Sequence, residues 1–520
     1  MNMAEMGLQK KTSVPGGATA GIMCGVLLAA SLLLLSLKNL FPHVAGHYLM
    51  PALQAPYGLL LAAGVVVVAC CFLFIRRLFR QLVPNKWLVV SVSMVVSLLQ
   101  MFLIYNYYFE TDWDVQQLVG AARAAAFHGR EAAAEYRWYF SECPNNLFLT
   151  GLFMLVFKTG ALFWTESLFP LLALQCLLFG LVSLMFYQTL LKCCKDAPTA
   201  FSGYLFFLLF TGLSPWISIP YSDVWSLFFS MGIVWLALTG VLSSKPLFKR
   251  CLFVFVSVLA YAVKPQLLLV ALAVVAVRLS DRSVRANLRA NLFRAKPVAS
   301  LVASLLFALL IVSLAGKSTG ISPDRHSAFG MTHYLLIGMN SRTIGDYAPE
   351  DVAFSRNYPD RASRAKAELA ETGRRVSEMG FAGFCRHLCE KLILTYGDGS
   401  FSWGKEGAFF HLILPEKNST VSPFLRSCYY TEPFGGSRFP WLLHAATLIW
   451  LGILFFSMIC VFLVRGRAGA TVSLALLFIL LFELLFECRA RYLFGFTPLY
   501  LLAACMGLHF CFSGNKIKKR

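Results

Sequence analysis

Residues 19–38, "TAGIMCGVLLAASLLLLSLK", decide the fold class of this chain. The stretch has no charged side chain before Lys38, and its 20 residues match the length at which a helix crosses a hydrocarbon core of about 30 Å. Similar apolar runs recur as far as residue 511. Because these runs are continuous and do not alternate between polar and apolar residues, they predict membrane helices and not a β-barrel.

The composition of the chain indicates the same class. Of its 520 residues, 58% are hydrophobic and 14% are charged, and the mean hydropathy is +0.66. This leaves too little polar surface to cover a soluble globule, so we predict an all-α polytopic membrane protein in a lipid bilayer. The runs predict about twelve spans, at residues 19–38, 57–75, 87–104, 167–191, 200–218, 222–242, 251–263, 265–279, 298–315, 441–464, 470–487 and 490–511.

The net charge of +20 comes largely from short basic connections between the apolar runs. In a soluble protein this charge would suggest nucleic acid, but the positive-inside rule places such connections in the cytoplasm, and we expect no nucleic-acid partner. Both termini are then cytoplasmic, and the expected location is the plasma membrane. The connections are residues 76–80, 192–196, 243–250, 278–296 and 464–467 and the terminal "KIKKR".

Two long segments lie on the outer side in this arrangement. We call them segment I, residues 105–166, and segment II, residues 316–440. Segment II is predicted to be mostly helical, with helical patterning around 358–396. Segments of this kind on a rigid scaffold commonly carry chemistry. The other expected domains are the N-terminal, central and C-terminal membrane regions, 1–104, 167–315 and 441–520.

Segment I contains an Ala-rich helical stretch, residues 115–136, followed by "NLFLTGLFMLVFK" at 146–158. The second stretch is apolar but short for a span. Counting it as a full span would put the later basic connections outside. We therefore predict a partial or re-entrant helix there.

Segment I opens with "YNYYFETDWDVQQLVG", residues 105–120, which sets Glu110, Asp112 and Asp114 where a membrane helix ends. Scarce water at this boundary would raise the pKa of a carboxylate and make it a better base for a hydroxyl proton. The alternative is structural, because Asp114 followed by Gln117 also resembles a helix cap with its reciprocal residue. At least one of Asp112 and Asp114 is a candidate catalytic base.

Two further polar residues stand where apolar runs end. Asp223, in "SPWISIPYSDVWSLFF", is a candidate site residue, although a helix cap would explain it equally well. Lys264, in "YAVKPQLLLV", is predicted at the outer tip of a tight hairpin. A lone Lys there needs water or an anion, and the alternative is a side chain that snorkels to the interface.

The last two spans are joined by "FELLFECRARYLFGFTPLY", residues 482–500. This connection puts Glu487, Arg489, Arg491 and Tyr492 on the outer side, where arginines run against the positive-inside trend. We therefore expect an anionic partner, and phosphate suits guanidinium groups best because they can bind it bidentately.

These motifs together resemble the GT-C superfamily of integral membrane glycosyltransferases, particularly the bacterial relatives of protein O-mannosyltransferases and lipid A aminoarabinose transferases. The resemblance covers most of the chain from residue 105. The motifs that carry it are "TDWD" (111–114), "YFSECPNNL" (139–147), "PYSD" (220–223), "KPQ" (264–266), "THYLLIGMN" (332–340), "GDYAPEDVAFS" (345–355), "YGDGSFSW" (396–403) and "ECRARY" (487–492).

The resemblance implies a transferase that takes a sugar from undecaprenyl phosphate or a similar polyprenyl phosphate at the outer face. The acceptor would be an envelope glycan, a teichoic acid-like polymer or a protein, as in cell wall biogenesis. An acid of the first outer loop, here Asp112 or Asp114, would be the general base. Lys264, Arg489 and Arg491, with Tyr492 beside them, would hold the donor phosphate.

The chain departs from the family pattern at two places. Asp-Trp-Asp replaces an adjacent acidic pair, which leaves open both the identity of the base and the need for a divalent cation. Asn145 and Asn146 occupy the position of a His-Pro-Pro or Lys-Pro-Pro element and are candidate substrate-binding residues. In segment II the candidates for shaping the acceptor site are His333, Asp346, Asp351 and Asp398, with solvated loop residues as the alternative.

Two other functions stay open at this point. A secondary transporter would show inverted repeats and ionisable residues near the bilayer midplane, and Glu483 is a residue of that kind. A polysaccharide polymerase or ligase would also use lipid-linked substrates on the outer face, but it would transfer whole glycans.

Overall fold

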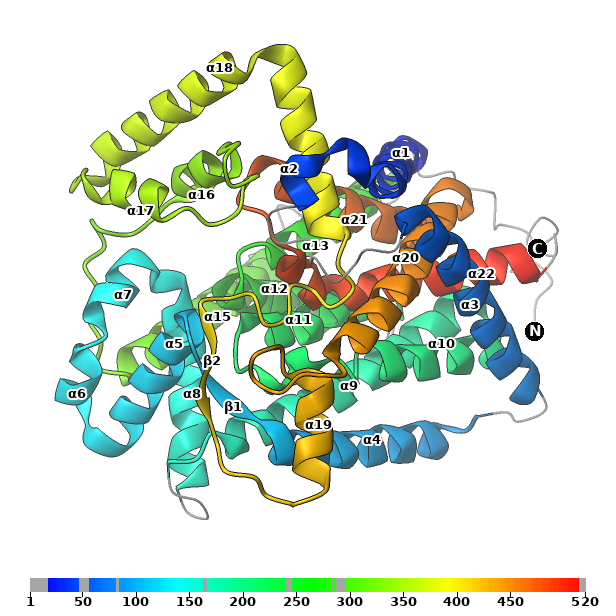
Figure 1. Cartoon of the computed structure of the whole chain (residues 1–520), viewed down its shortest axis with the longest axis horizontal. Helices are drawn as coiled ribbons and strands as arrows, with labels where there is room; N and C mark the ends of the chain where they lie inside the picture. The colour runs from blue at the N-terminus through cyan, green and yellow to red at the C-terminus, as the bar shows by residue number, and fades with distance from the viewer. Residues whose placement is uncertain are drawn as a thin grey trace.

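The computed structural model describes residues 17–45, 56–80, 84–161, 166–239, 246–282, 284–286 and 295–513. Over these residues the chain is almost entirely helical, as expected for an all-α polytopic membrane protein. Figure 1 shows long helices side by side in one part of the molecule and the short helices of residues 114–142 and 331–356 at its left edge. The two termini that we predicted to be cytoplasmic, residues 1–16 and 514–520, lie outside the described residues.

Eight helices of the described residues are long and apolar enough to cross a membrane. The other predicted spans also coincide with helices, but α10 and α13 have 14 residues each, about 21 Å of helix. The number twelve therefore stays a prediction. The eight are α1 (Gly17–Ser36), α3 (Tyr57–Leu78), α4 (Lys86–Tyr107), α9 (Phe169–Cys194), α15 (Ala295–Ser318), α20 (Phe439–Leu463), α21 (Arg467–Leu485) and the continuous η6 (Ala490–Phe496) and α22 (Thr497–Phe512); the others are α10 (Ala197–Phe210), α11 (Ser222–Leu238), α12 (Pro246–Val263) and α13 (Leu267–Ser280).

Segment I folds into short helices around one short strand. Gly129 has a φ of +92° and ends the Ala-rich helix, so this stretch is divided where the sequence predicted one helical unit. The stretch 146–158, for which we predicted a partial or re-entrant helix, coincides with α8, which has 14 residues like α10 and α13; its re-entrant course stays a prediction. The elements are β1 (Phe109–Asp112), α5 (Asp114–Arg123), η3 (Ala124–His128), α6 (Arg130–Ala134), α7 (Arg137–Glu142), η4 (Pro144–Asn146) and α8 (Leu147–Gly160).

Segment II is mostly helical, as predicted, and its longest helix, α18, covers the stretch with helical patterning. Gly380, with a φ of +60°, kinks this helix. Figure 1 shows α16 and α17 between α18 and the helices of segment I. The elements are α16 (Met331–Gly338), α17 (Pro349–Arg356), α18 (Arg361–Tyr396), β2 (Ala408–Ile413) and α19 (Val421–Tyr429).

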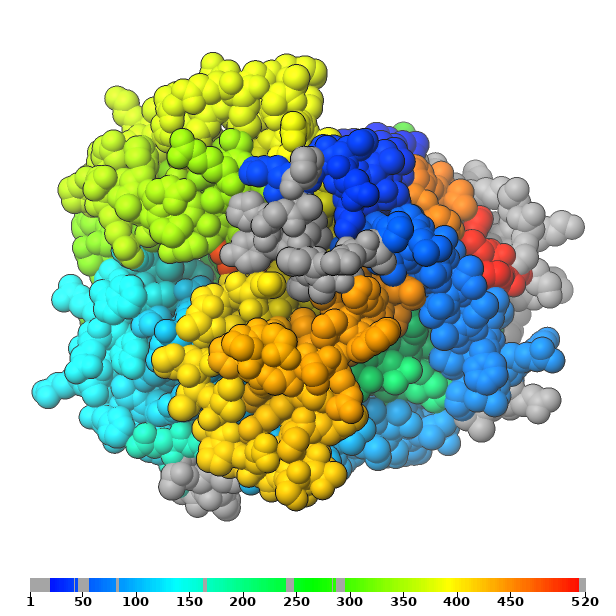
Figure 2. Space-filling model, in the orientation of Figure 1, coloured from blue at the N-terminus to red at the C-terminus, as the bar shows by residue number. Residues whose placement is uncertain are grey.

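A two-stranded antiparallel sheet joins the two segments. In this sheet β1 pairs with β2, with Phe109 opposite Ile413 and Asp112 opposite Ala408, and a bulge lies between Glu110 and Asp112. The sequence did not predict the sheet, because a four-residue strand is too short for an alternating pattern to be visible. Figure 2 shows the two segments, cyan and yellow-green to orange, as neighbouring masses on one face.

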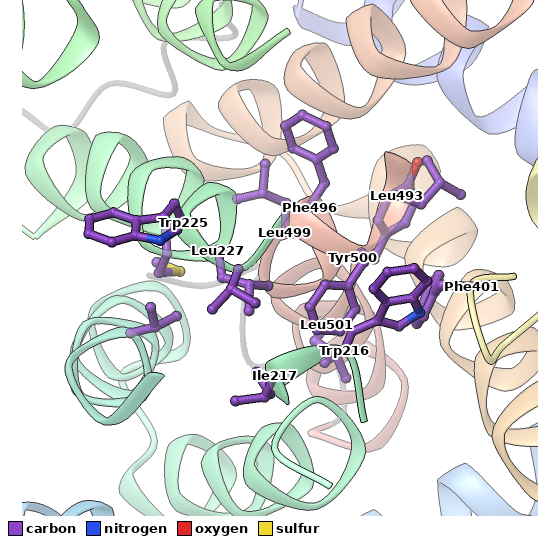
Figure 3. Close-up of a cluster of buried hydrophobic side chains, with 14 of the residues drawn as sticks. Trp216, Ile217, Trp225, Leu227, Phe401, Leu493, Phe496, Leu499, Tyr500 and Leu501 are labelled. Atoms are coloured by element: carbon purple, nitrogen blue, oxygen red, sulfur yellow. The ribbon is translucent and has the colours of Figure 1, made fainter. Parts of the chain in front are cut away.

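Large buried side chains from several helices pack together in one hydrophobic cluster. Trp216 of η5 (Pro215–Ser218) donates from Nε1 to the Ser400 carbonyl at 2.9 Å, and the hydroxyls of Tyr396 and Tyr500 lie 2.8 Å apart. The polar atoms of Trp216, Tyr396 and Tyr500 thus have partners within an apolar core. Figure 3 shows the cluster: Trp216, Ile217, Trp225, Leu227, Phe401, Leu493, Phe496, Leu499, Tyr500 and Leu501.

The crossing of α3 and α20 yields a stability prediction. A Cβ at Gly452 would lie 2.5 Å from the Gly64 carbonyl oxygen, and one at Gly64 would overlap the Leu448 carbonyl. Close crossings of this kind need small residues. We expect Gly452→Val to lower the free energy of unfolding by about 1–3 kcal/mol, measured as a lower midpoint of thermal unfolding in detergent. Gly58→Ala is the control, because its Cβ would meet only Ser36 at 3.9 Å; equal midpoints for both variants would contradict the prediction.

Candidate functional site

Segments far apart in the chain supply one buried set of ion pairs. Lys264 Nζ donates to Asp223 Oδ1 at 2.7 Å, and Arg491 Nε lies 3.4 Å from Glu406 Oε1 and 3.9 Å from Asp223 Oδ2. All four side chains are buried, with Arg491 only 4% exposed. We call this set the ion-pair cluster; it consists of Lys264, Arg489 and Arg491 with Asp223, Asp346, Glu406 and Glu487.

Lys264 is placed by the break between α12 and α13. The break follows from Pro265, whose ring prevents the helix from continuing. Lys264 meets an anion, the Asp223 carboxylate, and its side chain is buried, so the alternative of a side chain that snorkels to the interface is wrong. The helix-cap interpretation of Asp223 is also wrong: Tyr221 is the N-cap of α11, and no side chain caps that end. Both residues belong to the cluster because a buried ammonium needs a buried carboxylate.

Arg489 is held by three carboxylates. Its Nε lies 2.5 Å from Asp346 Oδ1 and 3.5 Å from Glu487 Oε1, and its Nη1 contacts Glu406. Tyr492, in turn, donates from its hydroxyl to Glu487 at 2.8 Å. Three carboxylates of the chain itself thus supply the anionic partners that we expected for Arg489.

Arg491 lies in a cage of aromatic rings. Its guanidinium carbon is 4.3 Å from the ring centre of Trp113, 5.3 Å from that of Tyr221 and 5.4 Å from that of Tyr492. Lys264 Nζ is 4.8 Å from the Tyr492 ring. Arg491 Nε and Nη1, like Trp113 Nε1, are buried and have no hydrogen-bond partner among the described residues. Because buried donors are costly to leave unpaired, Arg491 Nη1 and Trp113 Nε1 are candidates to bind an oxyanion, whereas Arg491 Nε already forms an ion pair with Glu406.

The structure separates the two candidate bases. Asp114 Oδ2 accepts a hydrogen bond from the Tyr221 hydroxyl at 2.9 Å, and the Tyr221 ring is one of the three around Arg491. The Asp112 side chain is 41% exposed, and its Oδ2 lies 3.8 Å from His411 Nδ1. Asp114 is not a cap, because Trp113 is the N-cap of α5 and no side chain caps that helix. The geometry therefore favours Asp114 as the base.

The two asparagines lie near Asp114. Asn146 Nδ2 donates to the Tyr139 hydroxyl at 2.6 Å, and Asn145 Nδ2 donates to Asn146 Oδ1 at 3.2 Å. Burial raises the pKa of Tyr139, and the charges of Asp114 and Tyr221 raise it further. Asn145 and Asn146 are thus linked to the candidate base through one tyrosine.

Three candidates of segment II do not join the cluster. His333 Nδ1 lies 2.7 Å from Ser355 Oγ, and Asp351 pairs with Arg375 at 2.5 Å. Asp398 accepts from the backbone N–H groups of Ser400 and Ser402. All three side chains are buried, so the alternative that they are solvated loop residues is wrong. Their contacts stabilise the fold of segment II.

Three residues of the site were not assigned from the sequence. Trp113 and Tyr221 stand inside the quoted motifs "TDWD" and "PYSD", but only the acidic members were chosen. Glu406, in "WGKEG", follows "YGDGSFSW" and carried no signal of its own. Its pairing with two arginines more than 80 residues away could be found only from the fold.

No group of three or more His, Cys, Asp or Glu side chains that could hold a metal ion is present among the described residues. Asp112 and Asp114, the pair proposed as cation ligands from the sequence, point to different partners, His411 and Tyr221. The residues present therefore do not fit a divalent-cation site at this pair.

Asp346 gives a pH-dependent prediction. Burial, opposed by Arg489 and assisted by Glu406, raises the pKa of its carboxyl from 3.8 to about 6. The stabilisation from holding this proton is present below pH 3.8 and is lost as the pH rises through about 6; a shift of about two units corresponds to about 3 kcal/mol. Asp346→Asn imitates the protonated form, so its stability relative to wild type should rise by up to this amount between about pH 4 and about pH 7. Thermal unfolding at both pH values tests this, and a pH-independent difference would contradict it.

Comparison with known proteins gives one result. Residues 49–511 match a family model described as "conserved hypothetical integral membrane protein". This range includes segment I, segment II and every residue of the ion-pair cluster. No curated protein and no solved structure matches the chain. Since the matched range is well over half of the chain, the protein belongs to the family of conserved hypothetical integral membrane proteins.

Proposed function

We propose that this protein is a membrane glycosyltransferase that moves a sugar from a polyprenyl-phosphate donor to an envelope glycan, teichoic acid-like polymer or protein on the outer face of the plasma membrane. The observation that carries the proposal is the cage around Arg491. There, the Tyr221 hydroxyl bonds the Asp114 carboxylate, and the Tyr221 ring lies against the Arg491 guanidinium, whose Nη1 has no hydrogen-bond partner among the described residues. A base and an oxyanion donor that share one neighbouring tyrosine suit sugar transfer from a phosphate.

The proposed reaction is a single displacement. Asp114 takes the proton of an acceptor hydroxyl as the hydroxyl oxygen attacks the anomeric carbon of the donor sugar. The bond from this carbon to the phosphate oxygen breaks, and the electron pair leaves with the polyprenyl phosphate. Arg491 and Lys264 stabilise the negative charge that develops on that phosphate.

The carboxylates around the cations have a role in this proposal. The cluster holds three cations and four carboxylates, so it does not attract a phosphate through excess positive charge. Instead, the carboxylates fix the cations, and the phosphate uses the unpaired donors of Arg491 and the remaining N–H groups of Lys264. Binding then depends on directed hydrogen bonds rather than on net charge.

A secondary transporter is the second candidate, and one observation favours it. Glu483 is buried within α21, and neither of its carboxylate oxygens has a hydrogen-bond partner among the described residues. A carboxylate of this kind is typical of proton or ion pathways. A polymerase or ligase for lipid-linked glycans shares the donor chemistry and differs in transferring a whole glycan.

An untargeted comparison of envelope glycans tests the proposal. Cells with and without the gene are compared, and the deletion strain is complemented with wild type, Asp112→Asn or Asp114→Asn. We expect the deletion to lose one sugar modification, which wild type and Asp112→Asn restore and Asp114→Asn does not. An unchanged set of glycans in the deletion strain would contradict the proposal, and so would restoration by Asp114→Asn.

A further inference from the structure

The loop between α16 and α17, residues 339–348, has a strained backbone. Ile344 and Gly345 have successive positive φ angles of +58° and +78°. A β-branched residue rarely adopts this conformation, which costs about 1–3 kcal/mol and persists only where the surroundings hold it. A Cβ at Gly345 would also lie 2.9 Å from the Gly338 carbonyl oxygen. Strain of this kind is commonly found where a side chain must be held in a particular place.

The contacts that hold this loop connect it to the ion-pair cluster. The Cys488 N–H donates to the Gly345 carbonyl at 2.9 Å, next to Arg489 in the chain. The carboxylate of Asp346 accepts from the backbone N–H of Tyr347 at 2.7 Å and binds Arg489 Nε at 2.5 Å. Arg489 of the ion-pair cluster therefore fixes the backbone position of Tyr347 through Asp346.

Tyr347 stands at the boundary between the site and water. Tyr347 is 48% exposed, and the centre of its ring lies 5.7 Å from the guanidinium carbon of Arg489. Burial raises the pKa of its hydroxyl, which Arg356 and Arg489 lower and Asp114 raises. Through Arg489, the ring of Tyr347 thus borders the ion-pair cluster.

We propose that Tyr347 is the platform on which the acceptor sugar stacks, so that the strained loop presents an acceptor subsite of the transferase. The inference rests on the proposed function. A polyprenyl donor arrives through the bilayer, whereas an envelope glycan arrives from water. The half-exposed ring faces water, and the donor-side cations are buried.

The surroundings of Tyr347 identify the class of acceptor. Arg356 makes two hydrogen bonds to Glu142, at 2.6 and 2.8 Å, which tie α17 to α7. Arg489 is paired with three carboxylates. The cations that act on Tyr347 are therefore both neutralised, which disfavours an anionic acceptor. A flat aromatic face beside carboxylates fits a neutral sugar ring, which offers C–H groups to the ring and hydroxyls to the carboxylates.

The test measures acceptor binding without any donor. Wild type, Tyr347→Phe, Tyr347→Ala and Phe381→Ala are prepared in nanodiscs. Phe381 is the matched control because it is an exposed aromatic residue (87%) of segment II, next to the kink of α18. The probes are cellotetraose, chitotetraose and a Ser/Thr-rich peptide, and saturation-transfer NMR gives each dissociation constant.

We expect wild type, Tyr347→Phe and Phe381→Ala to bind at least one of the two sugars with similar affinity, and Tyr347→Ala to bind it about tenfold more weakly. Equal binding by Tyr347→Ala would overturn the platform, and so would failure of wild type to bind either sugar. Binding of the peptide alone, lost in Tyr347→Ala, would overturn the assignment to a glycan. Because no donor is present, Tyr347-dependent sugar binding without transfer activity would leave the subsite standing and refute the proposed transferase instead.

Discussion

Asp114→Asn should lower the turnover number for sugar transfer by about 10³-fold, whereas Asp112→Asn should leave it within about threefold of wild type. The reason is that Asn cannot accept the proton of the acceptor hydroxyl. The Asp114 carboxylate accepts from the hydroxyl of Tyr221, whose ring contacts Arg491, and the Asp112 carboxylate faces water and His411. The measurement is single-turnover transfer from a polyprenyl-phosphate sugar by protein reconstituted in lipid.

Two controls separate catalysis from folding in this experiment. Asn can still accept a hydrogen bond from Tyr221, so Asp114→Asn should unfold at nearly the wild-type temperature. Donor binding should also be retained, because Asp114 does not contact the phosphate in the proposed reaction. Loss of activity in Asp112→Asn with full activity in Asp114→Asn would reverse the assignment of the base.

Arg491→Ala should weaken binding of the lipid donor by at least about 30-fold. The variant removes the Nη1 donor, which has no hydrogen-bond partner in the described part of the chain, and it also removes the stacking on Trp113. Arg491→Lys keeps the charge but not the planar group, so it should bind with intermediate affinity. The measurement is the dissociation constant for undecaprenyl phosphate in nanodiscs.

The matched control for this prediction is Arg374→Ala. Arg374 is 56% exposed and pairs with Glu371 and Glu378 within its own helix, so its loss removes one positive charge without touching the site. Removing Arg491 leaves Glu406 with one fewer ion-pair partner, which can lower the stability of the protein. Because Arg491→Lys keeps a positive charge beside Glu406, it shows whether a loss of donor binding follows only from lower stability. Unchanged donor affinity in Arg491→Ala would refute the phosphate role.

Much of the membrane architecture could be predicted from the sequence because it depends on local composition. An apolar run such as residues 19–38 needs no tertiary partner to form a helix in a bilayer. For the same reason, the short length of residues 146–158 already indicated an incomplete span, and the structure has a 14-residue helix there. The pattern around residues 358–396 likewise predicted α18.

The site could be predicted only in part because it depends on contacts between distant residues. Lys264, Asp223 and Arg491 stood out because each is a charged residue beside an apolar run, and they do meet. Glu406 did not stand out, because a carboxylate in a polar loop is ordinary until the fold brings it to an arginine. The choice between Asp112 and Asp114 was likewise open until the fold placed Asp112 beside His411 of β2 and Asp114 on the hydroxyl of Tyr221.

The most direct test of the central claim is a product assay with a doubly labelled donor. Reconstituted protein receives a polyprenyl-phosphate sugar with different labels on the sugar and the phosphate, together with isolated envelope glycans and proteins. We expect wild type to release polyprenyl phosphate and to form the new glycosidic bond in equal amounts, and Asp114→Asn to do neither. Movement of a labelled solute across the bilayer with an intact donor, or equal product from Asp114→Asn, would contradict it.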